Sequence, residues 1–428
     1  MTDPRRLQLR ADAEAILRAG IAGAAPGPLL LRALRQRTLT TPVHLLAIGK
    51  AATMMARAAY QSVRVRSALV IAPAAADGPW PPPAPRVIAS DHPIPGQRSI
   101  DAARAVQAFL EQLVADDVAL VLLSGGGSSL LTLPAPGLTL YDLGATTRVL
   151  MAAGADIQAL NCVRRHLDDV KGGRLARLAA PASVICLALS DVPGDDPAAI
   201  ASGPFSPDPT TFRLALDVLR DHGVLERVPR AVRLHLERGE TGDADESLKP
   251  GDSAFQRVQF EIIGSNRNAR EAAAAEAGRR GYQPAVATTW LSGDARLAGE
   301  QLGRALAAAG AVQRQAMVFG GETTVRVRGP GRGGRNQELA LAAAAAIADV
   351  PGVALGTVGT DGIDGTSPAA GAIVDGSTTE RLRALGIDPE RALAANDSYG
   401  ALAAVGDALI TGPTGTNVMD IALTLALP

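Results

Sequence analysis

The sequence predicts an α/β protein with more than one domain, and three observations support this fold class. Short apolar runs, such as residues 118–123 and 184–189, have the pattern of strands buried on both faces of a parallel sheet. Helical segments alternate with these runs along the chain. The length of 428 residues exceeds what one core ordinarily holds, so two or three domains are expected. We place the boundary in the polar, acidic segment 239–253, which gives domains at residues 1–245 and 246–428.

The first half of the chain alternates between helices and strands. Residues 4–20 form an amphipathic pattern that ends at a glycine, as a helix commonly does. The short apolar runs are bounded by turn-forming residues, as buried strands are. We expect further helices from Gly49 to about residue 63 and over 140–153, and strands at residues 43–48, 68–72, 118–123 and 184–189.

The same alternation resumes beyond the proposed boundary. We expect strands at residues 260–264, 316–319 and 353–358, and an alanine-rich helix that ends near Arg280. The strand at 316–319 alternates polar and apolar residues, as an edge or antiparallel strand does. A second strand is expected to follow it through Arg328, and then a long alanine-rich helix.

Composition and charge exclude several classes of function. The formal net charge is −1 and aromatic residues make up 3%, so the chain offers neither a basic surface nor a stacking platform for nucleic acid. Cys162 and Cys186 suit a reducing compartment and match no metal-binding spacing. The N-terminus lacks the apolar core of a signal peptide, and no apolar run approaches the ~18 residues of a membrane span. We therefore expect a cytoplasmic protein that binds neither nucleic acid nor membrane.

The loop after the apolar run at 118–123 is the first candidate for a ligand site. This glycine loop consists of Ser124, Gly125, Gly126, Gly127, Ser128 and Ser129. Three glycines allow a sharp turn that exposes backbone N–H groups, and the serines add hydroxyl donors. Such a loop after a strand commonly binds an anion, most often phosphate. A tight turn without a ligand explains the loop equally well when it is taken alone, and the other loops shift the balance.

Lys50 lies at the turn between the strand at 43–48 and the helix that Gly49 opens. Its ammonium group would point in the same direction as the N-terminus of that helix, which favours an anion-binding role over a merely solvated lysine. The turn is not a Walker phosphate loop, because His44 replaces the first glycine and Ala51 replaces the serine or threonine.

Two loops place carboxylates after predicted strands. Asp191 follows the strand at 184–189, at the edge where open α/β sheets bind ligands, and it suits either Mg²⁺ or an incoming proton. Asp195 and Asp196 are equally suited to capping a helix. Asp361 lies in the pattern D-G-x-D-G, which lacks the length of a calcium loop. The pattern is either a simple turn or a second carboxylate loop that completes a metal or substrate site.

Several basic residues have two interpretations. His92 lies in a rigid turn, and a structural role is favoured over contact with a substrate. A basic cluster precedes a short helix and would either neutralise an anionic substrate or form a solvated helix face. This basic cluster consists of Arg164, Arg165, His166, Lys171 and Arg174.

Gly329, Gly331 and Gly334 satisfy the G-x-G-x-x-G spacing of a dinucleotide-binding loop. Pro330 stiffens the turn, however, and two arginines, one of them Arg335, stand beside the glycines. Two arginines in a glycine loop suit a highly charged phosphate chain better than a dinucleotide, so we interpret the match as weak.

The loops share one composition: each follows a strand and contains glycine, small hydroxyl residues and a charged or amide side chain. Together they suggest a cleft lined with backbone donors, cations and a few carboxylates. Phosphoryl transfer requires this set, because cations and N–H groups hold the phosphates while carboxylates hold Mg²⁺. The sequence contains no nucleophile elbow of a Ser-His-Asp hydrolase, no zinc-binding spacing and no candidate cysteine nucleophile, any of which would favour another chemistry.

Six of these loops resemble the motifs of one known family. They read L-L-S-G-G-G-S-S at 122–129, S-D-V-P-G-D-D at 190–196, G-G-E-T-T at 320–324, G-R-N-Q-E at 334–338, G-T-D-G-I-D-G at 359–365 and G-P-T-G-T-N-V at 412–418. Together and in this order they are similar to the class II glycerate 2-kinases, which carry a C-terminal MOFRL domain. The match extends over nearly the whole chain, so it is far more specific than any single loop.

The resemblance implies both a fold and a reaction. The fold would combine an N-terminal Rossmann-like three-layer domain, with a mostly parallel sheet, and a smaller C-terminal α/β domain of the MOFRL type. The active site would lie in the cleft between them. The reaction would be ATP-dependent phosphorylation of D-glycerate at its 2-hydroxyl, with Mg²⁺ or another divalent cation, and the products would be 2-phosphoglycerate and ADP. The protein would be a monomer or a homodimer.

The resemblance also implies roles for individual residues. Lys50 and Arg335 would be the cations on the transferring phosphate, and Asp191 would bind metal or the substrate hydroxyl. Glu322 would be a second metal ligand. The glycine loop would hold phosphate or the glycerate carboxylate. Further contacts to substrate or phosphate are expected from the polar side chains of the other loops, namely Asn266, Glu322, Asn336, Gln337, Asp361 and Asn417.

Two other functions are open at this point. Members of the family often carry the name hydroxypyruvate or tartronate reductase, and an NAD(P)H-dependent reductase would use the glycines at 329–334 as its dinucleotide loop. A sensor that binds a ligand without catalysis would make the charged loop residues dispensable. Lys50, Asp191, Glu322 and Arg335 are all present, which favours the kinase.

Overall fold

The structure is a computed structural model that describes residues 3–75 and 78–428. The chain forms two compact units. Residues 26–263 make up the parallel unit, and residues 1–25 together with 264–428 make up the mixed unit; each is named for its sheet. This division differs from the predicted boundary at 245/246, because a strand that ends at Gly264 completes the sheet of the parallel unit.

The parallel unit contains a six-stranded sheet with the strand order β3-β2-β1-β4-β5-β6. Its strands are β1 (Val43–Ile48), β2 (Val65–Ala72), β3 (Arg86–Ala89), β4 (Val118–Leu123), β5 (Ser183–Leu189) and β6 (Val258–Gly264). The pairs β1–β2, β1–β4, β2–β3 and β4–β5 are parallel. This is the order of the doubly wound Rossmann fold, whose direction of winding reverses between β1 and β4. The predicted strands and the Rossmann-like fold class are confirmed.

Two separate cores cover the two faces of this sheet, as alternation along β1 requires. Leu45 and Ala47 pack with α2 (Pro26–Arg35) and α3 (Ala52–Tyr60), whereas Leu46 and Ile48 face the opposite core. The helices of that second core include α4 (Gln97–Leu110) and α8 (Arg174–Ala179). Helix, sheet and helix form the expected three layers.

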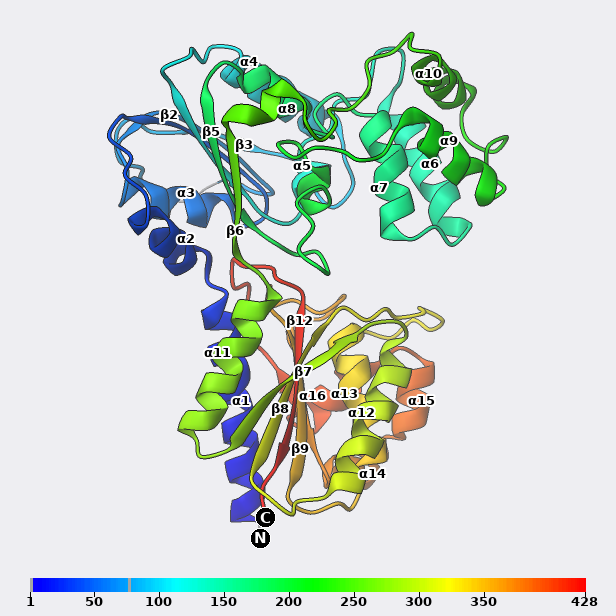
Figure 1. The fold of residues 1–428 in the computed structure, drawn as a ribbon. Helices are drawn as coiled ribbons and strands as arrows, with labels where there is room; N and C mark the ends of the chain where they lie inside the picture. The colour runs from blue at the N-terminus through cyan, green and yellow to red at the C-terminus, as the bar shows by residue number, and fades with distance from the viewer. Residues whose placement is uncertain (1–2, 76–77) are drawn as a thin grey trace. The chain divides into compact units, whose positions relative to one another are not determined.

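A helical subdomain extends from the parallel unit and has a small core of its own (Figure 1). Its helices are α6 (Leu140–Ala152), α7 (Ile157–His166), α9 (Phe212–Asp221) and α10 (Arg230–Glu240). Two short elements join it to the sheet layers, α5 (Gly127–Leu130) and η1 (Ile200–Ser202), and η2 (Ser253–Arg257) precedes β6. The helix predicted at 140–153 is confirmed.

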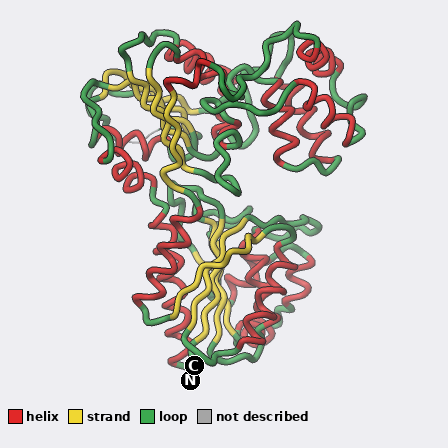
Figure 2. The backbone as a smooth tube through the Cα atoms, viewed as in Figure 1, coloured by secondary structure: helices red, strands yellow, loops and turns green. Residues whose placement is uncertain are grey.

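The mixed unit also contains six strands, in the order β11-β10-β9-β12-β8-β7. They are β7 (Gln283–Leu291), β8 (Gln315–Gly321), β9 (Val353–Gly359), β10 (Gly371–Asp375), β11 (Ala408–Leu409) and β12 (Asp420–Ala426). Within this sheet, as far as the structure describes it, the β7–β8 pair is parallel and the other ladders are antiparallel. Figure 2 shows these strands flanked by helices on both faces.

Helices cover both faces of the mixed sheet (Figure 1). One face packs against α1 (Pro4–Gly23) and α11 (Asn266–Arg279). The other face packs against α12 (Ala295–Ala309), α13 (Arg335–Ala346), α14 (Thr378–Ala384), α15 (Pro389–Ala394) and α16 (Ser398–Ala404). The predicted α/β character of the second domain is confirmed.

The N-terminal helix α1 packs on the mixed unit although it precedes the parallel unit in sequence. Gly23 fits so closely against α11 that an added Cβ would lie 2.2 Å from the Cβ of Ala272. Buried Asp12 accepts hydrogen bonds from Arg280 at 2.8 Å and from Tyr282 at 2.9 Å. Removing one partner from such a buried charge cluster is strongly destabilising, so these contacts explain the placement of α1.

The strand predicted to run through Arg328 is wrong. Residues 322–328 have no ladder among the described residues and make one isolated bridge, from Thr324 to Asp294. The physical reason is that β8 already has β7 and β12 as neighbours, so the chain leaves the sheet after Gly321. In the described part of the chain, no helix is both long and apolar enough to cross a membrane.

Candidate active site

The loops after β1 and β4 meet at the point where the winding of the parallel sheet reverses. The N–H of Lys50 donates to the carbonyl of Gly125 at 2.9 Å, and the N–H of Ala51 donates to Ser124 Oγ at 3.0 Å. Gly49 has φ +126°, and a Cβ there would lie 2.2 Å from Ser124 Oγ, so only glycine fits. Open α/β sheets bind ligands at this switch point.

The glycine loop presents backbone donors that have no acceptor in the protein. Across the ranges 3–75 and 78–428, the N–H groups of residues 125–128 donate to no protein atom. Gly126 adopts φ +83° and is partly exposed, as is Ser128. Consecutive N–H groups in a turned backbone form a concavity that suits an anion. Ser124 and Ser129 instead hold the loop together, the latter by donating to the Gly126 carbonyl at 3.0 Å.

Three charged or titratable side chains surround this loop. A Cβ on Gly125 would lie 2.0 Å from Asp191 Oδ2, and a Cβ on Gly126 would lie 3.1 Å from His92 Nε2 and 3.2 Å from Lys50 Cγ. The structure therefore brings together Lys50, Asp191 and the glycine loop, as the sequence predicted. It also places His92 there, for which a structural role was favoured. Burial, and then the charge of Lys50, lower the pKa of His92, which favours the uncharged ring.

A pair of hydroxyl groups, from the predicted Ser128 and from a serine that the sequence did not mark as a site residue, joins the loop to the helical subdomain. Ser128 Oγ lies 2.8 Å from Ser202 Oγ, which in turn donates to Asn161 Oδ1 at 3.5 Å. Ala201 and Ser202 adopt φ 51° and 62°, a region that costs energy for residues other than glycine. Strained backbone of this kind commonly marks functional sites. The strain was not visible in the sequence.

Most of the basic cluster is engaged inside the protein. Arg165 donates to the carbonyl of Ala198 at 3.0 Å and pairs with Asp208 at 3.1 Å. Lys171 forms a buried ion pair with Asp168. Further internal partners come from carbonyl and carboxylate groups: Arg174 donates to the carbonyls of Arg165, Lys171 and Asp245, and His166 Nε2 lies 2.8 Å from Glu246. These four residues are structural.

Arg164 is the exception within the basic cluster. Its side chain has no hydrogen bond or ion pair with any residue that the structure describes, although it is only partly exposed. Burial lowers its pKa, which means that the surroundings disfavour an unpaired charge. Arg164 lies one turn after Asn161 on α7, so the two side chains share one face of the helix, and Asn161 on that face accepts from Ser202 at 3.5 Å. An anion from outside the protein would complete this site.

In the mixed unit, Arg335 begins α13 and is held by two carboxylates. It pairs with Glu322 at 3.0 Å and with Asp420 at 2.5 Å. Burial lowers the pKa of Arg335, but the hydrogen bond and charge of Asp420 outweigh this and raise it. Burial raises the pKa of Asp420 to about 6 despite the guanidinium beside it. The sequence predicted Glu322 and Arg335 but missed Asp420, which no motif marks as functional.

The first turn of α13 is fixed by Asp364. Its carboxylate accepts from the N–H of Asn336 at 3.1 Å and from the N–H and Nε2 of Gln337 at 2.9 and 2.8 Å. Gln337 is fully buried, and these contacts fix the turn that carries Arg335, while the predicted contact of Asn336 and Gln337 with a ligand stays a prediction. Asp364 was the second aspartate of the D-G-x-D-G pattern and was not selected from the sequence.

The other predicted residues of the mixed unit order neighbouring loops. Asn266 donates to the carbonyls of Val418 and Asp420 at 2.9 Å each. The side chains of Asn417 and Asp361 accept from backbone N–H groups two residues further on, at 3.2 Å each. Direct contact of these residues with substrate stays a prediction, as does a site between the two domains.

Comparison with known proteins identifies the class of protein that this fold and these loops define. Residues 12–237 match the family described as a domain of unknown function, DUF4147, and residues 315–420 match the MOFRL family. The first match alone covers more than half of the chain. The protein is a two-unit α/β protein of the DUF4147–MOFRL type.

Comparison with named relatives identifies the family within this class. The chain is 41% identical to the glycerate 2-kinase of Pyrococcus horikoshii, over 90% of this chain and 87% of the relative, and 41% identical to the D-glycerate 2-kinase of Thermotoga maritima, over 90% of each. It is 40% identical to a putative hydroxypyruvate reductase of Agrobacterium vitis, over 78% of this chain and 76% of the relative. The crystal structure of a glycerate kinase from Thermotoga maritima superposes with a TM-score of 0.87 at 38% identity, covering 99% of this chain and 100% of that one. The chain belongs to the class II glycerate 2-kinase family.

Proposed function

We propose that the protein transfers the terminal phosphoryl group of ATP to the 2-hydroxyl of D-glycerate, which gives 2-phosphoglycerate and ADP. One observation carries the proposal: Lys50, Asp191 and the unpaired N–H groups of the glycine loop converge at the switch point of the parallel sheet. The identity of 41% to two named glycerate 2-kinases supports the same reaction.

The proposed catalytic groups act mainly through charge. The transferring phosphoryl group spreads negative charge over three oxygens, and catalysis consists of positioning and stabilising that charge. Lys50 and the N–H groups at 125–128 would supply fixed positive potential on one side. Arg335 would supply the guanidinium, which it can do only by exchanging Glu322, the more exposed of its two carboxylate partners, for a phosphate.

The substrate would be held by its carboxylate and its hydroxyl group. Arg164 has no partner among the described residues and would bind the carboxylate, an interaction for which a guanidinium is well suited. Ser128 and Ser202 would orient the 2-hydroxyl. During transfer, this oxygen bonds to phosphorus while the bond to ADP breaks. The hydroxyl proton then passes to a neighbouring acceptor, for which Asp191 and uncharged His92 are both suited.

A divalent cation is part of the proposal. Asp191 fits Mg²⁺, because this ion is usually held by one or two carboxylates together with substrate phosphates. Glu322 fits less well, since Arg335 engages it at 3.0 Å. When bound, Mg²⁺ would neutralise charge on the phosphate oxygens.

The alternative function, a reductase, would need the glycines at 329–334 to bind a dinucleotide, and their packing does not support this. A Cβ on Gly329 would lie 2.3 Å from the carbonyl oxygen of Ala395, and one on Gly331 would lie 2.5 Å from the N–H nitrogen of Asp397. These glycines therefore allow close packing within the chain rather than an approach to a dinucleotide. The first turn of the parallel sheet, where a dinucleotide fold requires its glycines, reads G-K-A-A.

Product identification tests the proposal. The purified protein is incubated with D-glycerate, ATP and Mg²⁺, and the products are followed by phosphorus NMR, with hydroxypyruvate and NADH in a parallel assay. A 2-phosphoglycerate signal without NADH oxidation is expected. A 3-phosphoglycerate signal would keep the kinase and overturn the position of transfer, and NADH oxidation alone would overturn the kinase.

We further propose that the enzyme acts in the cytoplasm as a monomer or homodimer. Light scattering coupled to size-exclusion chromatography measures the molar mass directly, and a mass above that of two chains would contradict this.

A further inference from the structure

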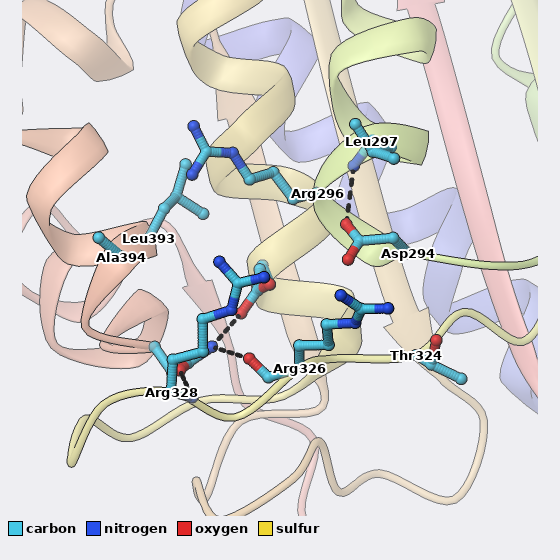
Figure 3. A pocket seen from close by; sticks show the side chains of 10 residues that line it. Asp294, Arg296, Leu297, Thr324, Arg326, Arg328, Leu393 and Ala394 are labelled. Atoms are coloured by element: carbon cyan, nitrogen blue, oxygen red, sulfur yellow. Dashed lines mark hydrogen bonds between the residues drawn. The ribbon is translucent and has the colours of Figure 1, made fainter. Parts of the chain in front are cut away.

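A cavity of about 690 Å³ lies within the mixed unit, beside the first turn of α13 (Figure 3). Its walls come from the segment at 322–328, the start of α12 and the end of α15. The lining residues that bear charge are Asp294, Arg296, Arg326, Arg328 and Glu338. Leu297, Leu393 and Ala394 add an apolar strip. The cavity thus combines a charged wall with an apolar one.

The backbone that carries two of the arginines is fixed. The Asn396 side chain accepts from the N–H groups of Arg328 at 2.6 Å and Gly329 at 3.0 Å, and it donates to the carbonyl of Arg326 at 3.1 Å. At the other end, the N–H of Ala295 donates to the Thr324 carbonyl at 2.9 Å. Residues two apart in extended chain share a face, so Thr324, Arg326 and Arg328 line the cavity together. Figure 3 shows both arginine side chains directed into it.

These two guanidinium groups are not neutralised. Neither Arg326 nor Arg328 makes a side-chain hydrogen bond or ion pair within residues 3–75 and 78–428. Arg296 is different, since it pairs with Glu300 at 3.3 Å and Glu390 at 2.5 Å. Both arginines are exposed, so water screens much of the repulsion between their like charges, and a bound polyanion would relieve the remainder.

The acidic residues of the cavity are already engaged. Glu338 accepts from Asn396 Nδ2 at 3.1 Å, and its burial raises its pKa, which favours the uncharged form. Asp294 accepts from the N–H of Leu297 at 3.1 Å as the cap of α12. The cavity wall therefore carries the charges of Arg326 and Arg328 against the carboxylate of Asp294.

Two elements connect this cavity to Arg335. Glu322, which pairs with Arg335, precedes the lining residue Thr324 by two positions of extended chain, or roughly 6.6 Å. Glu338 follows Arg335 by about one turn of α13, or roughly 5 Å. A chain of two or three phosphates in the cavity could therefore reach the Arg335 guanidinium without leaving the mixed unit.

We propose that this cavity is the nucleotide subsite: it holds the nucleoside of ATP or ADP against the apolar strip and its inner phosphates between Arg326 and Arg328, with the terminal phosphate directed toward Arg335. The inference rests on the proposed function, because it takes ATP as the co-substrate. It assigns a role to two arginines that the sequence motifs left without one.

Calorimetric titration of the full chain with ADP in the presence of Mg²⁺ tests the subsite. Arg326→Ala and Arg328→Ala should each weaken ADP binding about tenfold, because each removes a charge-assisted contact to phosphate. The double variant should weaken it by more than either alone, while the KM for glycerate stays unchanged. Arg328→Lys, which keeps the charge, should retain most of the affinity. Arg279→Ala removes an equal charge from the exposed face of α11 and should have no effect.

Each other outcome is informative. Unchanged ADP affinity in the double variant, with a wild-type melting temperature, would overturn the proposal. Two ADP sites, of which the variant loses one while the KM for ATP stays constant, would also overturn it, because the cavity would then be regulatory. Arginine-dependent ADP binding in a protein that does not phosphorylate glycerate would retain the subsite and reject the proposed function instead.

Discussion

The glycine loop of the parallel unit and the first turn of α13 in the mixed unit both offer positive charge to a phosphate, but they hold it differently. In the glycine loop, four consecutive N–H groups lack an acceptor among the described residues, and Arg164 of the same unit also lacks a partner there. In the first turn of α13, by contrast, Arg335 is paired with two carboxylates and Asp364 fixes the backbone. One site is open and the other is filled by the protein itself.

This difference suits the two sites to different tasks. A buried N–H group without an acceptor destabilises the fold by about 1–3 kcal/mol, so such groups must contact water or a ligand. They can therefore bind an anion without first breaking a contact within the protein. A guanidinium clamped between carboxylates is fixed in place but is masked until a phosphate displaces one of them. The open loop is therefore suited to capturing the substrate or phosphate, and Arg335 is suited to a charge that appears during transfer.

The largest expected effect comes from removing the two cations. Lys50→Ala and Arg335→Ala should each lower kcat by about a hundredfold or more, because each removes charge stabilisation that is strongest in the transition state. Steady-state kinetics with glycerate and ATP measure this, and Arg279→Ala provides the matched loss of one charge. Turnover near the wild-type value in both variants would remove them from the active site.

Arg164 should affect binding more than turnover. Arg164→Ala should raise the KM for glycerate by about 10- to 100-fold, because a hydrogen bond to a charged group contributes about 1.5–3 kcal/mol. The neutral amide of glycerate separates this role from a structural one. The wild-type enzyme should prefer glycerate strongly over the amide, and the variant should lose that preference. An unchanged ratio between the two substrates would contradict the assignment.

Asp420, which pairs with Arg335, should make the stability of the protein depend on pH. Its folded-state pKa of about 6 lies above its ordinary value of 3.8, so the folded protein binds an extra proton between these values. Stability contributed by this group is full below about pH 4 and is lost as the pH rises through about 6. Asp420→Asn removes this pH dependence. The change in the free energy of unfolding that it removes is about 3 kcal/mol, at about 1.4 kcal/mol per unit of pKa.

Chemical denaturation of both proteins between pH 4 and pH 8 measures the difference. The free energy of unfolding of Asp420→Asn relative to the wild type should rise by up to that amount as the pH increases. A difference that does not vary with pH would mean that Asp420 is ionised throughout, as its pair with Arg335 alone would make it.

The same comparison shows what the sequence could reveal. Lys50, Asp191 and the glycine loop follow three parallel strands, and the carboxyl ends of such strands share one edge, so local pattern sufficed to predict that they meet. Arg164 could not be selected, because nothing local distinguishes it from Arg165, whose partner Asp208 is distant in sequence. Asp420 and the placement of α1 likewise depend on contacts between residues hundreds of positions apart.

The smallest effect is expected from the charged network around Glu246 in the helical subdomain, whose members already have partners within the protein. Burial raises the pKa of Glu246, but the hydrogen bond from His166 and other donors outweigh this and lower it from 4.5 to about 2. Its stabilising contribution is therefore present above about pH 4.5 and is lost as the pH falls toward 2. The side chain is 36% exposed, so solvent screening reduces this contribution to about 1 kcal/mol. Glu246→Gln should lower the free energy of unfolding by that amount at pH 7, with kcat and both KM values unchanged. A loss of activity at equal stability would show that this network reaches the active site and is not purely structural.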